Sequence, residues 1–277
     1  MGSNDHYVAS LKGAILKAIE NPHIIDVTHE VRPFDTAEAA YHVSSCYKDF
    51  PDGTVHLIGV DSEPVVNFGG SDGCFPSILE FHNQYFVCND NGFFGVFLQQ
   101  NKAQSFWRID DVLSNPKLFK FPTKNMLVGA VTSIINGTPL NEIASPQESF
   151  RNALAYVATS ETNLIKGHVV HCDSYGNAIT NIHKSLFDRY GKDIPFIIRF
   201  KKSDYFIDFI SISYNEVPPG EKVAVFNSND LLEIAINRGA SKTNGGAQQL
   251  FGLNKNDVVR VEFTPKGSKE TIEDLFS

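Results

Sequence analysis

The sequence predicts an α/β N-terminal domain with a mostly parallel sheet, followed by a smaller, mostly antiparallel β C-terminal domain. In the first half, helical periodicity alternates with short, continuous apolar runs, which is typical of parallel strands covered on both faces. After Gly167, short strand-like segments separated by turn residues dominate. The 277 residues allow one large domain or two small ones. We expect domains at 1–162 and 166–277, with a boundary near 160–166.

The chain begins with a predicted helix and a predicted buried strand. Apolar residues recur at helical spacing over residues 8–19, and Asn21-Pro22 stops this helix. The short apolar run at 24–27 predicts a buried strand. Asp35 then has the character of an N-cap, and Glu38 three positions later completes a capping box, which predicts a second helix.

The apolar run at 54–60 predicts another strand of the parallel sheet, ending at Asp61. In such sheets ligands bind beyond the carboxyl ends of the strands, so residues 28–30 and 61–63 are expected at the edge of a site. The other elements expected in this half are a Gly-rich loop at 62–75, strands at 77–81 and 84–88, a turn at 89–92 and a helix at 125–136.

The second half has the pattern of an antiparallel β domain. One helix is expected near 229–238, with Asn227 or Ser228 as its cap. The expected strands are 167–172, 194–200, 206–212, 222–226 and 257–263.

Composition excludes several classes of function. The formal net charge of −8 argues against non-specific binding to nucleic acid or to anionic membranes. No apolar stretch approaches 18 residues, and the first ten residues have no signal-peptide pattern, so we expect a cytoplasmic protein with no membrane span. The four cysteines, Cys46, Cys74, Cys88 and Cys172, form no CxxC pair, which favours free thiols over disulfides or zinc ligands.

Common sequence motifs for nucleotide binding, hydrolysis and metal binding give little indication of function here. The sequence contains no Walker A motif, no G-x-G-x-x-G after a strand and no G-x-S-x-G. His168 and His171 stand three apart on a predicted strand and so face opposite sides, which disfavours a shared metal. Polar residues do gather at strand ends in 26–35, 173–182 and 227–235, although each cluster alone is typical of turns and caps.

Taken together, these clusters and their neighbours form an ordered set of segments. They are Asp5-x-Tyr7-Val8-x3-Lys12-Gly13, IIDVTHEVRPFD at 24–35, AEAAYHV at 37–43, FPDGTVHLIGVD at 50–61, YFVCNDNG at 85–92, DSYGNAITNI at 173–182 and VAVFNSNDLLEIAINRGAS at 223–241. This set resembles the S-adenosylmethionine hydroxide adenosyltransferases, relatives of the S-adenosylmethionine-dependent fluorinases and chlorinases. The resemblance covers nearly the whole chain. It implies the two domains described above and a homotrimer with sites between subunits.

The resemblance also implies a reaction. A nucleophile attacks ribose C5′ of S-adenosylmethionine and methionine leaves; with water, the products are adenosine and methionine. Because the sulfonium is already an activated leaving group, neither a general acid nor a cofactor or metal is needed. The site needs a dry pocket, an in-line nucleophile and a group that orients or deprotonates the water.

Substrate-binding roles follow by position in the resemblance. At the methionine end, Asp173 would hold the ammonium, and Ser228 with Asn229 would hold the carboxylate. Phe34 occupies an aromatic position near the ribose and methionine.

At the adenine end of the substrate, Asn177 would read the edge of the base, and Tyr214 would stack on its face. Asp61 matches the family's water-orienting Asp, and Glu63 is a second candidate for that role. His29 is a further candidate, although a structural hydrogen bond is its expected use.

The chain departs from the family at other catalytic positions. The family's Arg is missing from the 62–75 loop, and Pro122-Thr123-Lys124-Asn125 stands where the family has His-Gly-Arg-Asp. Thr123 lies near the position of a halide-binding Ser in the fluorinases. Three functions therefore stay open: a hydrolase with a reworked water site, a binding protein that has lost catalysis, and a halogenase-like enzyme.

The start of the chain also departs from the family, which opens with a strand ending in Thr-Asp-Phe-Gly. Here Met1-Gly2 stands at the Phe-Gly position. The alternatives are a start assigned too far downstream, a cloning scar or true loss of the strand, and we favour a truncated or misassigned start. Without that strand, the edge of the sheet should be exposed and a ribose ligand missing.

Overall fold

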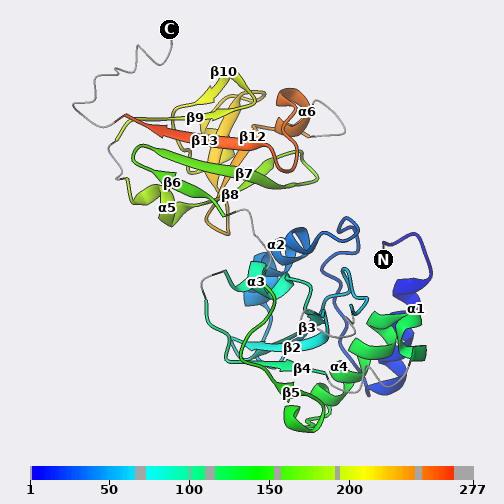
Figure 1. The fold of residues 1–277 in the computed structure, drawn as a ribbon. Helices are drawn as coiled ribbons and strands as arrows, with labels where there is room; N and C mark the ends of the chain where they lie inside the picture. The colour runs from blue at the N-terminus through cyan, green and yellow to red at the C-terminus, as the bar shows by residue number, and fades with distance from the viewer. Residues whose placement is uncertain are drawn as a thin grey trace. The chain divides into compact units, whose positions relative to one another are not determined.

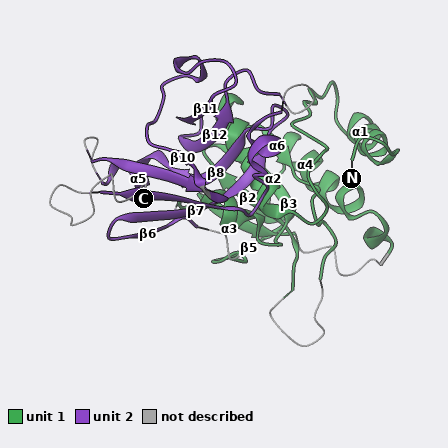
Figure 2. Ribbon diagram, turned by 90° about the horizontal axis from the view of Figure 1, so that it is seen from above, with its two compact units in different colours: residues 1–155 green, residues 156–277 purple. Residues whose placement is uncertain are grey.

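The structure is a computed structural model that describes residues 2–65, 73–99, 101–109, 116–152, 157–190, 194–240 and 245–264. It divides into two compact units, residues 1–155 and 156–277 (Figure 2). The central part of the Gly-rich loop predicted at 62–75 lies outside the described residues.

Unit 1 is built on one mixed sheet (Figure 1). In spatial order its strands are β1 (Val55–Leu57), β3 (Gln84–Asn89), β2 (Pro76–Phe81), β4 (Ser105–Arg108) and β5 (Ser145–Pro146). Only β1 and β3 pair in parallel, and the other three pairings are antiparallel. The predicted parallel character is therefore only partly confirmed. The reason is the two-residue turn at His82 and Asn83, whose φ angles of 50° and 57° fit a hairpin that forces β2 and β3 antiparallel.

Helices lie on both faces of this sheet. They are α1 (Tyr7–Ala18), α2 (Thr36–Cys46), α3 (Phe93–Leu98) and α4 (Val128–Ile135). Neighbouring residues of β2 point to opposite sides: Leu79 packs with the α2 and α3 cluster, and Ile78 packs with the α1 and α4 cluster. The short helical turns among the described residues are η1 (Tyr47–Asp49), η3 (Pro116–Lys120), η4 (Thr123–Leu127), η5 (Leu140–Glu142) and η6 (Tyr214–Glu216).

The first two predicted helices are confirmed, with one change at the cap of α2. The Asp35 carboxylate accepts a hydrogen bond from the Glu38 backbone N–H at 3.0 Å, as an N-cap should. The Asp35 backbone N–H donates to the Arg32 carbonyl at 3.1 Å, and the Glu38 side chain accepts from the Arg32 backbone N–H at 3.4 Å. The helix predicted at 125–136 begins as the π-helical turn η4 and continues as α4.

The strand predicted at 24–27 is wrong. This segment is in no described strand, and the Ile25 side chain is 68% exposed. β1, the end strand of the sheet, has β3 as its one neighbour among the described strands. Thr54 and Ile58 bond to β3, so the backbone groups of Val55 and Leu57 point to the free edge. A cavity of about 560 Å³ lies between this edge, α1 and the 20–31 segment. Without a strand beside them, the apolar side chains at 24–27 have no sheet to join.

Unit 2 is one antiparallel sheet that nearly closes on itself. Its strands, in spatial order, are β10 (Lys202–Ile207), β9 (Phe196–Phe200), β13 (Val258–Phe263), β7 (Leu164–Cys172), β8 (Ala178–His183), β12 (Leu231–Ile236) and β11 (Lys222–Phe226), with β6 (Thr159–Glu161) paired to β7. Ser211, shortly after β10, bridges to Val225 of β11 and brings the two ends together. The short helices α5 (Lys184–Asp188) and α6 (Ala247–Phe251) complete the unit.

The predicted antiparallel character of the second half is confirmed, with corrections. The strand expected at 206–212 is instead β10 at 202–207, and β8 was not expected. The helix predicted at 229–238 is wrong, because this segment forms β12 between β8 and β11. Leu232, Ile234 and Ile236 point into the core at a spacing of two, and β-branched side chains fit such a surface well.

Two expectations from composition can be compared with the structure. All four cysteines are free thiols. Among the described residues, no helix combines the length and the apolar character that crossing a membrane requires.

Two isoleucines test the difference between the 24–27 segment and a true core strand. Ile78→Ala empties a fully buried position of β2 and should lower the free energy of unfolding by about 2–5 kcal/mol. Ile25→Ala removes exposed atoms and should change it by less than about 0.5 kcal/mol. Urea unfolding followed by the fluorescence of Trp107, the single tryptophan, reports on unit 1. Equal costs at the two positions would mean that 24–27 is a buried strand after all.

Candidate functional site

The loop after β1 presents the carboxylate of Asp61. Asp61 is exposed and has a φ of 47°, a left-handed conformation that is uncommon for residues other than glycine. The side-chain amide of Asn91 donates to the carbonyls of Val60 and Asp61, both at 2.9 Å, and Asn89 donates to the carbonyl of Glu63 at 3.0 Å. These amides hold the backbone and leave the Asp61 carboxylate unbonded among the described residues.

The same loop contacts η4 through two hydroxyl groups. The oxygens of Ser62 and Thr123 lie 2.7 Å apart, and Thr123 is fully buried. Lys124, the next residue of this π-helical turn, donates to Ser10 of α1 at 3.1 Å. Turns of this kind are frequent at functional sites. The structure therefore brings Thr123 to the residue that follows Asp61, a pairing that the sequence did not predict.

Asp90 lies between the two asparagines that hold this loop. Its carboxylate accepts the backbone N–H of Arg151 at 2.9 and 3.0 Å. Burial raises the pKa of Asp90 to about 6, although the hydrogen bond and the positive charge of Arg151 lower it. The Arg151 guanidinium donates to the Cys74 sulfur at 2.6 Å, so a cation does reach the described end of the 62–75 loop.

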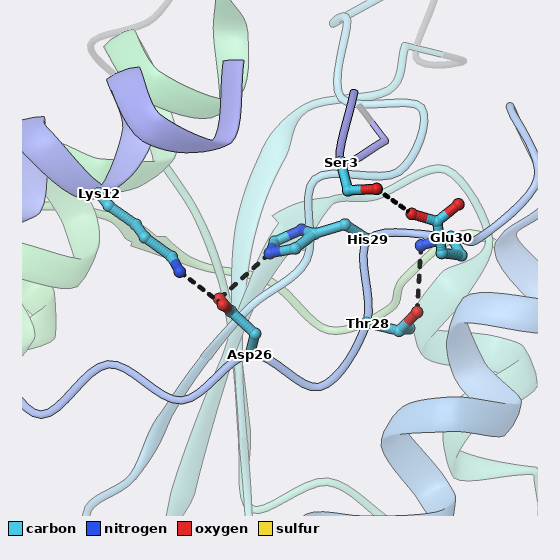
Figure 3. Close-up of polar contacts among 6 residues, drawn as sticks. All are labelled: Ser3, Lys12, Asp26, Thr28, His29 and Glu30. Atoms are coloured by element: carbon cyan, nitrogen blue, oxygen red, sulfur yellow. Dashed lines mark hydrogen bonds and ion pairs between the residues drawn. The ribbon is translucent and has the colours of Figure 1, made fainter. Parts of the chain in front are cut away.

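The predicted site edge at 28–30 forms a second polar cluster (Figure 3). Lys12 of α1 and His29 both reach the Asp26 carboxylate, at 2.5 and 3.1 Å. The hydrogen bond from Lys12 is the main cause that holds the pKa of Asp26 below its usual range. Thr28 accepts the backbone N–H of Glu30 at 3.1 Å. His29 is therefore an ion-pair neighbour of Asp26 when it is protonated, whereas its buried Nε2 has no hydrogen-bond partner among the described residues.

Phe34 stands in the turn that enters α2. Its φ is 64° and its side chain is 77% exposed. A bulky residue in the left-handed region, with its ring in solvent, is strained without a packing gain in the unit itself. This arrangement is consistent with a ring that contacts something outside the unit, but no described contact links Phe34 to the Asp61 loop.

In unit 2, the loop between β7 and β8 is organised by Asp173. One carboxylate oxygen accepts the backbone N–H groups of Tyr175 and Asn177, both at 2.9 Å, and the other accepts the Asn177 side-chain amide at 3.1 Å. Gly246 packs against this loop so closely that a Cβ there would lie 2.2 Å from the Tyr175 carbonyl oxygen. The loop is therefore fixed from inside by Asp173 and from outside by the start of α6.

Glu233 of β12 is the centre of the polar cluster in this unit. It is 4% exposed and faces away from the apolar core side of its strand. The Tyr214 hydroxyl donates to it at 2.6 Å and the Asn227 amide at 3.2 Å. Burial raises the pKa of Glu233, hydrogen bonds from Tyr214, Asn227 and Asn177 lower it, and the nearby charge of Asp173 raises it.

The remaining predicted residues of unit 2 lie beside this cluster. Tyr214 is 39% exposed, so its hydroxyl is anchored while part of its ring is open to solvent. Asn227 also accepts the backbone N–H groups of Asn229 and Leu231, at 3.0 and 3.2 Å. These bonds close a tight turn between β11 and β12, in which Ser228 is exposed. Asn227 thus shapes a hairpin where a helix cap was predicted.

The structure thus groups the predicted residues into separate sets. Tyr214 and the turn with Ser228 and Asn229 are joined through Glu233, and Asn177 bonds to Asp173, whose charge lies near Glu233. Asp61 and Glu63 share one loop of unit 1. Sequence analysis did not identify Glu233. The sequence did contain a signal for Glu233. A charged residue inside the apolar run LLEIAI needs polar partners if the run is buried.

Family models match both halves of the chain. The SAM hydroxide adenosyltransferase N-terminal domain matches residues 1–144, and the corresponding C-terminal domain matches residues 167–260.

Individual relatives agree with this match. An (R)-S-adenosyl-L-methionine hydrolase of Methanocaldococcus jannaschii is 28% identical over 269 residues, which cover 94% of this chain and 92% of the relative. A fluorinase of an Actinoplanes species is 24% identical over 218 residues, covering 69% and 72%. The crystal structure of an uncharacterized conserved protein from Thermotoga maritima superposes with a TM-score of 0.79 at 26% identity, covering 94% of this chain and 96% of that one.

The raised pKa of Asp90 predicts a pH-dependent stability. Its folded pKa of about 6 lies above the value of about 3.9 in an unfolded chain, so its stabilising effect is complete below about pH 4 and is lost as pH rises through about 6. Asp90→Asn imitates the neutral form. The variant should gain about 1–3 kcal/mol over the native protein between pH 4 and 7.5, after allowance for partial exposure.

Urea unfolding followed by Trp107 fluorescence at several pH values measures this difference. Asp52→Asn, an exposed aspartate of the same unit, is the control for removing one charge. A difference between Asp90→Asn and native protein that stays constant with pH would show that Asp90 does not titrate in this range.

Proposed function

Because the chain belongs to the SAM hydroxide adenosyltransferase family, we propose that it cleaves S-adenosylmethionine with water, producing adenosine and methionine. The hydrolase activity in the name of the Methanocaldococcus relative, which aligns over most of both chains, supports this choice.

The observation that carries the proposal is the cluster around Glu233. Hydrogen bonds join Tyr214 and the 227–230 turn to Glu233, and another joins Asn177 to Asp173, whose charge lies near Glu233. A carboxylate for an ammonium group, an amide for a base edge and a partly exposed aromatic ring are what an amino acid joined to a purine nucleoside requires. The proposed roles of Asp173, Asn177 and Tyr214 follow from this match.

The chemical step needs little from the protein. The water oxygen forms a bond to ribose C5′ as the C5′–sulfur bond breaks, and the electron pair of that bond stays on sulfur, so methionine leaves as a neutral thioether. One proton of the water must be removed. We assign this to Asp61, whose carboxylate is exposed and unbonded among the described residues while its backbone is held by Asn91. Glu63 on the same loop is the second candidate.

We propose that neither a cofactor nor a metal takes part. The sulfonium already carries the activation that a Lewis acid or a general acid would otherwise supply. The role of the protein is to hold C5′ in line with the water and to exclude other water molecules.

One observation favours a halide as a second candidate nucleophile. The Ser62 and Thr123 hydroxyls lie 2.7 Å apart in a partly buried place next to Asp61 in the chain, and hydroxyl groups can hold a small anion as well as a water. One of the relatives is named a fluorinase, an enzyme name that implies a halide as the nucleophile in that protein. Chloride attack at C5′ would yield a chlorinated nucleoside instead of adenosine.

We further propose a homotrimer, which the family resemblance implies, with residues of neighbouring subunits sharing a site. Phe34 is the residue whose exposure this would explain, since its ring would be covered in the assembly. Light scattering after size-exclusion chromatography should give about three times the chain mass of 30.7 kDa. Phe34→Asp should shift the distribution to monomers, and a native protein that elutes as a monomer at all concentrations contradicts the proposal.

Asp61→Asn tests the role of the water-orienting carboxylate. We expect kcat for S-adenosylmethionine cleavage to fall by about 100- to 10,000-fold, because the variant cannot take the proton, while KM changes little. Chromatography of the nucleosides with and without chloride measures the rate and identifies the nucleophile. Asp52→Asn is the matched control.

The possible outcomes separate the candidate functions. Adenosine and methionine in equal amounts support the hydrolase, and a chlorinated nucleoside supports the halide route. Binding by calorimetry with no product would assign the protein to the binding class. Equal turnover of Asp61→Asn and native protein would remove Asp61 from the mechanism.

A further inference from the structure

The loop that carries Asp61 is attached at both of its ends to the end of β3. Where the loop starts, the side-chain amides of Asn89 and Asn91 donate to backbone carbonyls of the loop. Where it returns, the backbone N–H of Asp90 donates to the carbonyl of Phe75 at 2.8 Å. Three consecutive residues therefore fix both the departure and the return of the loop.

The two ends of the loop also pair with each other. Val65 and Cys74 exchange two backbone hydrogen bonds, at 3.1 and 2.9 Å. The ends approach so closely that a Cβ on Gly73 would lie 2.7 Å from the Val65 carbonyl oxygen, which is closer than real Cβ atoms come. Because tightly packed groups transmit small displacements, a shift of Cys74 reaches Val65, which follows Asp61 by four positions.

Arg151 connects this pair to the end of β3. Its backbone N–H donates to both oxygens of the Asp90 carboxylate, at 2.9 and 3.0 Å, and its guanidinium donates to the Cys74 sulfur at 2.6 Å. Cys74 is 6% exposed, so little water can replace this donor. A charged donor strengthens the contact to a weak acceptor such as a thiol. The backbone of Arg151 is thus fixed by Asp90, and its side chain fixes Cys74.

We propose that Arg151 is a positioning residue for the cleavage of S-adenosylmethionine, because it holds the returning end of the loop and thereby keeps Asp61 where it can take the proton from water. The inference rests on the proposed function, in which Asp61 is the base. Arg151 itself takes no part in the chemical step. It acts through Cys74 and Val65, whose pairing determines the course of the backbone after Asp61.

A substitution at Arg151 separates its side-chain contact from its backbone contact. Arg151→Met keeps the backbone N–H to Asp90 and an unbranched side chain, but it removes the guanidinium. We expect kcat to fall by about 10- to 100-fold, the upper value being the cost of displacing a reacting group by about 1 Å. KM should stay within about threefold, because the proposed substrate-binding residues of unit 2 are untouched. Arg151→Lys keeps a cation and should recover part of kcat.

The double variant with Asp61→Asn shows whether Arg151 acts through Asp61. If it does, Arg151→Met should lower kcat by less than about threefold in the Asp61→Asn background, because residues that act as a unit are not additive. A merely structural effect would lower kcat by the same factor in both backgrounds. Arg189→Met removes an exposed arginine at the end of α5, and this matched control should leave kcat unchanged.

Hydrogen exchange followed by mass spectrometry reports on the loop without any turnover. The amides of Val65 and Cys74 are bonded to each other and exchange only when the pair opens. In Arg151→Met they should exchange about 3- to 10-fold faster at constant pH, the range that the loss of one hydrogen bond gives. Amides of β3 around the buried Val87 should exchange as in the native protein.

The inference is overturned if Arg151→Met keeps the native kcat, if exchange at Val65 and Cys74 is unchanged, or if kcat falls equally with and without Asp61→Asn. Cys74→Ala removes the other partner of the same contact and provides the same tests if Arg151→Met does not fold. Failure of the proposed function has a different signature. A native protein that releases no adenosine refutes cleavage, whereas faster exchange in Arg151→Met would still show that Arg151 holds the loop.

Discussion

The need to satisfy a buried carboxylate governs the polar side of unit 2. Glu233 sits in a strand whose neighbours are apolar, and a charge in that place is tolerated only with several hydrogen-bond donors around it. Those donors come from η6 and from the turn between β11 and β12. One buried acid therefore fixes two separate segments of the chain.

Unit 1 holds its functional loop by a different device. The loop after β1 is held by the neutral amides of Asn89 and Asn91, which bond to backbone carbonyls. This leaves the Asp61 carboxylate without a hydrogen bond among the described residues, whereas Asp173 and Glu233 of unit 2 both accept hydrogen bonds. The contrast matches the work proposed for each: a group that takes a proton must be free to do so, and groups that recognise a ligand must be held still.

The sequence predicted correctly those helices and strands that are determined by residues within or next to them. α1 and α2 follow from helical spacing and from the cap at Asp35, and several strands of unit 2 follow from alternation between turns. The failures depend on neighbours distant in sequence. The apolar run at 24–27 looks like a strand but has none beside it, and the run at 231–236 looks helical until β8 and β11 enclose it. The turn at His82 and Asn83 decides the direction of β2, and its residues gave no strong Gly signal.

The candidate site residues also divide into those that the sequence could predict and those that depend on contacts between distant residues. The resemblance picked out Asp173, Asn177 and Tyr214 by position, but it could not show that Tyr214 and Asn227 share Glu233, because hydrogen bonds depend on side-chain geometry across strands. Ser62 and Thr123 are likewise 61 residues apart and meet only in the folded unit. Residue types at strand ends can be recognised in a sequence, whereas the side-chain contacts between separate segments cannot.

The open edge of β1 has a consequence for how the protein behaves in a test tube. Val55 and Leu57 turn unpaired backbone groups toward a large apolar cavity, and such an edge is a template for any extended chain. Unit 2 has less of this weakness, since its sheet nearly closes. Aggregation during storage or heating should therefore start in unit 1, by strand addition at β1, while unit 2 is still folded. Covering the β1 edge should therefore help to keep a preparation soluble.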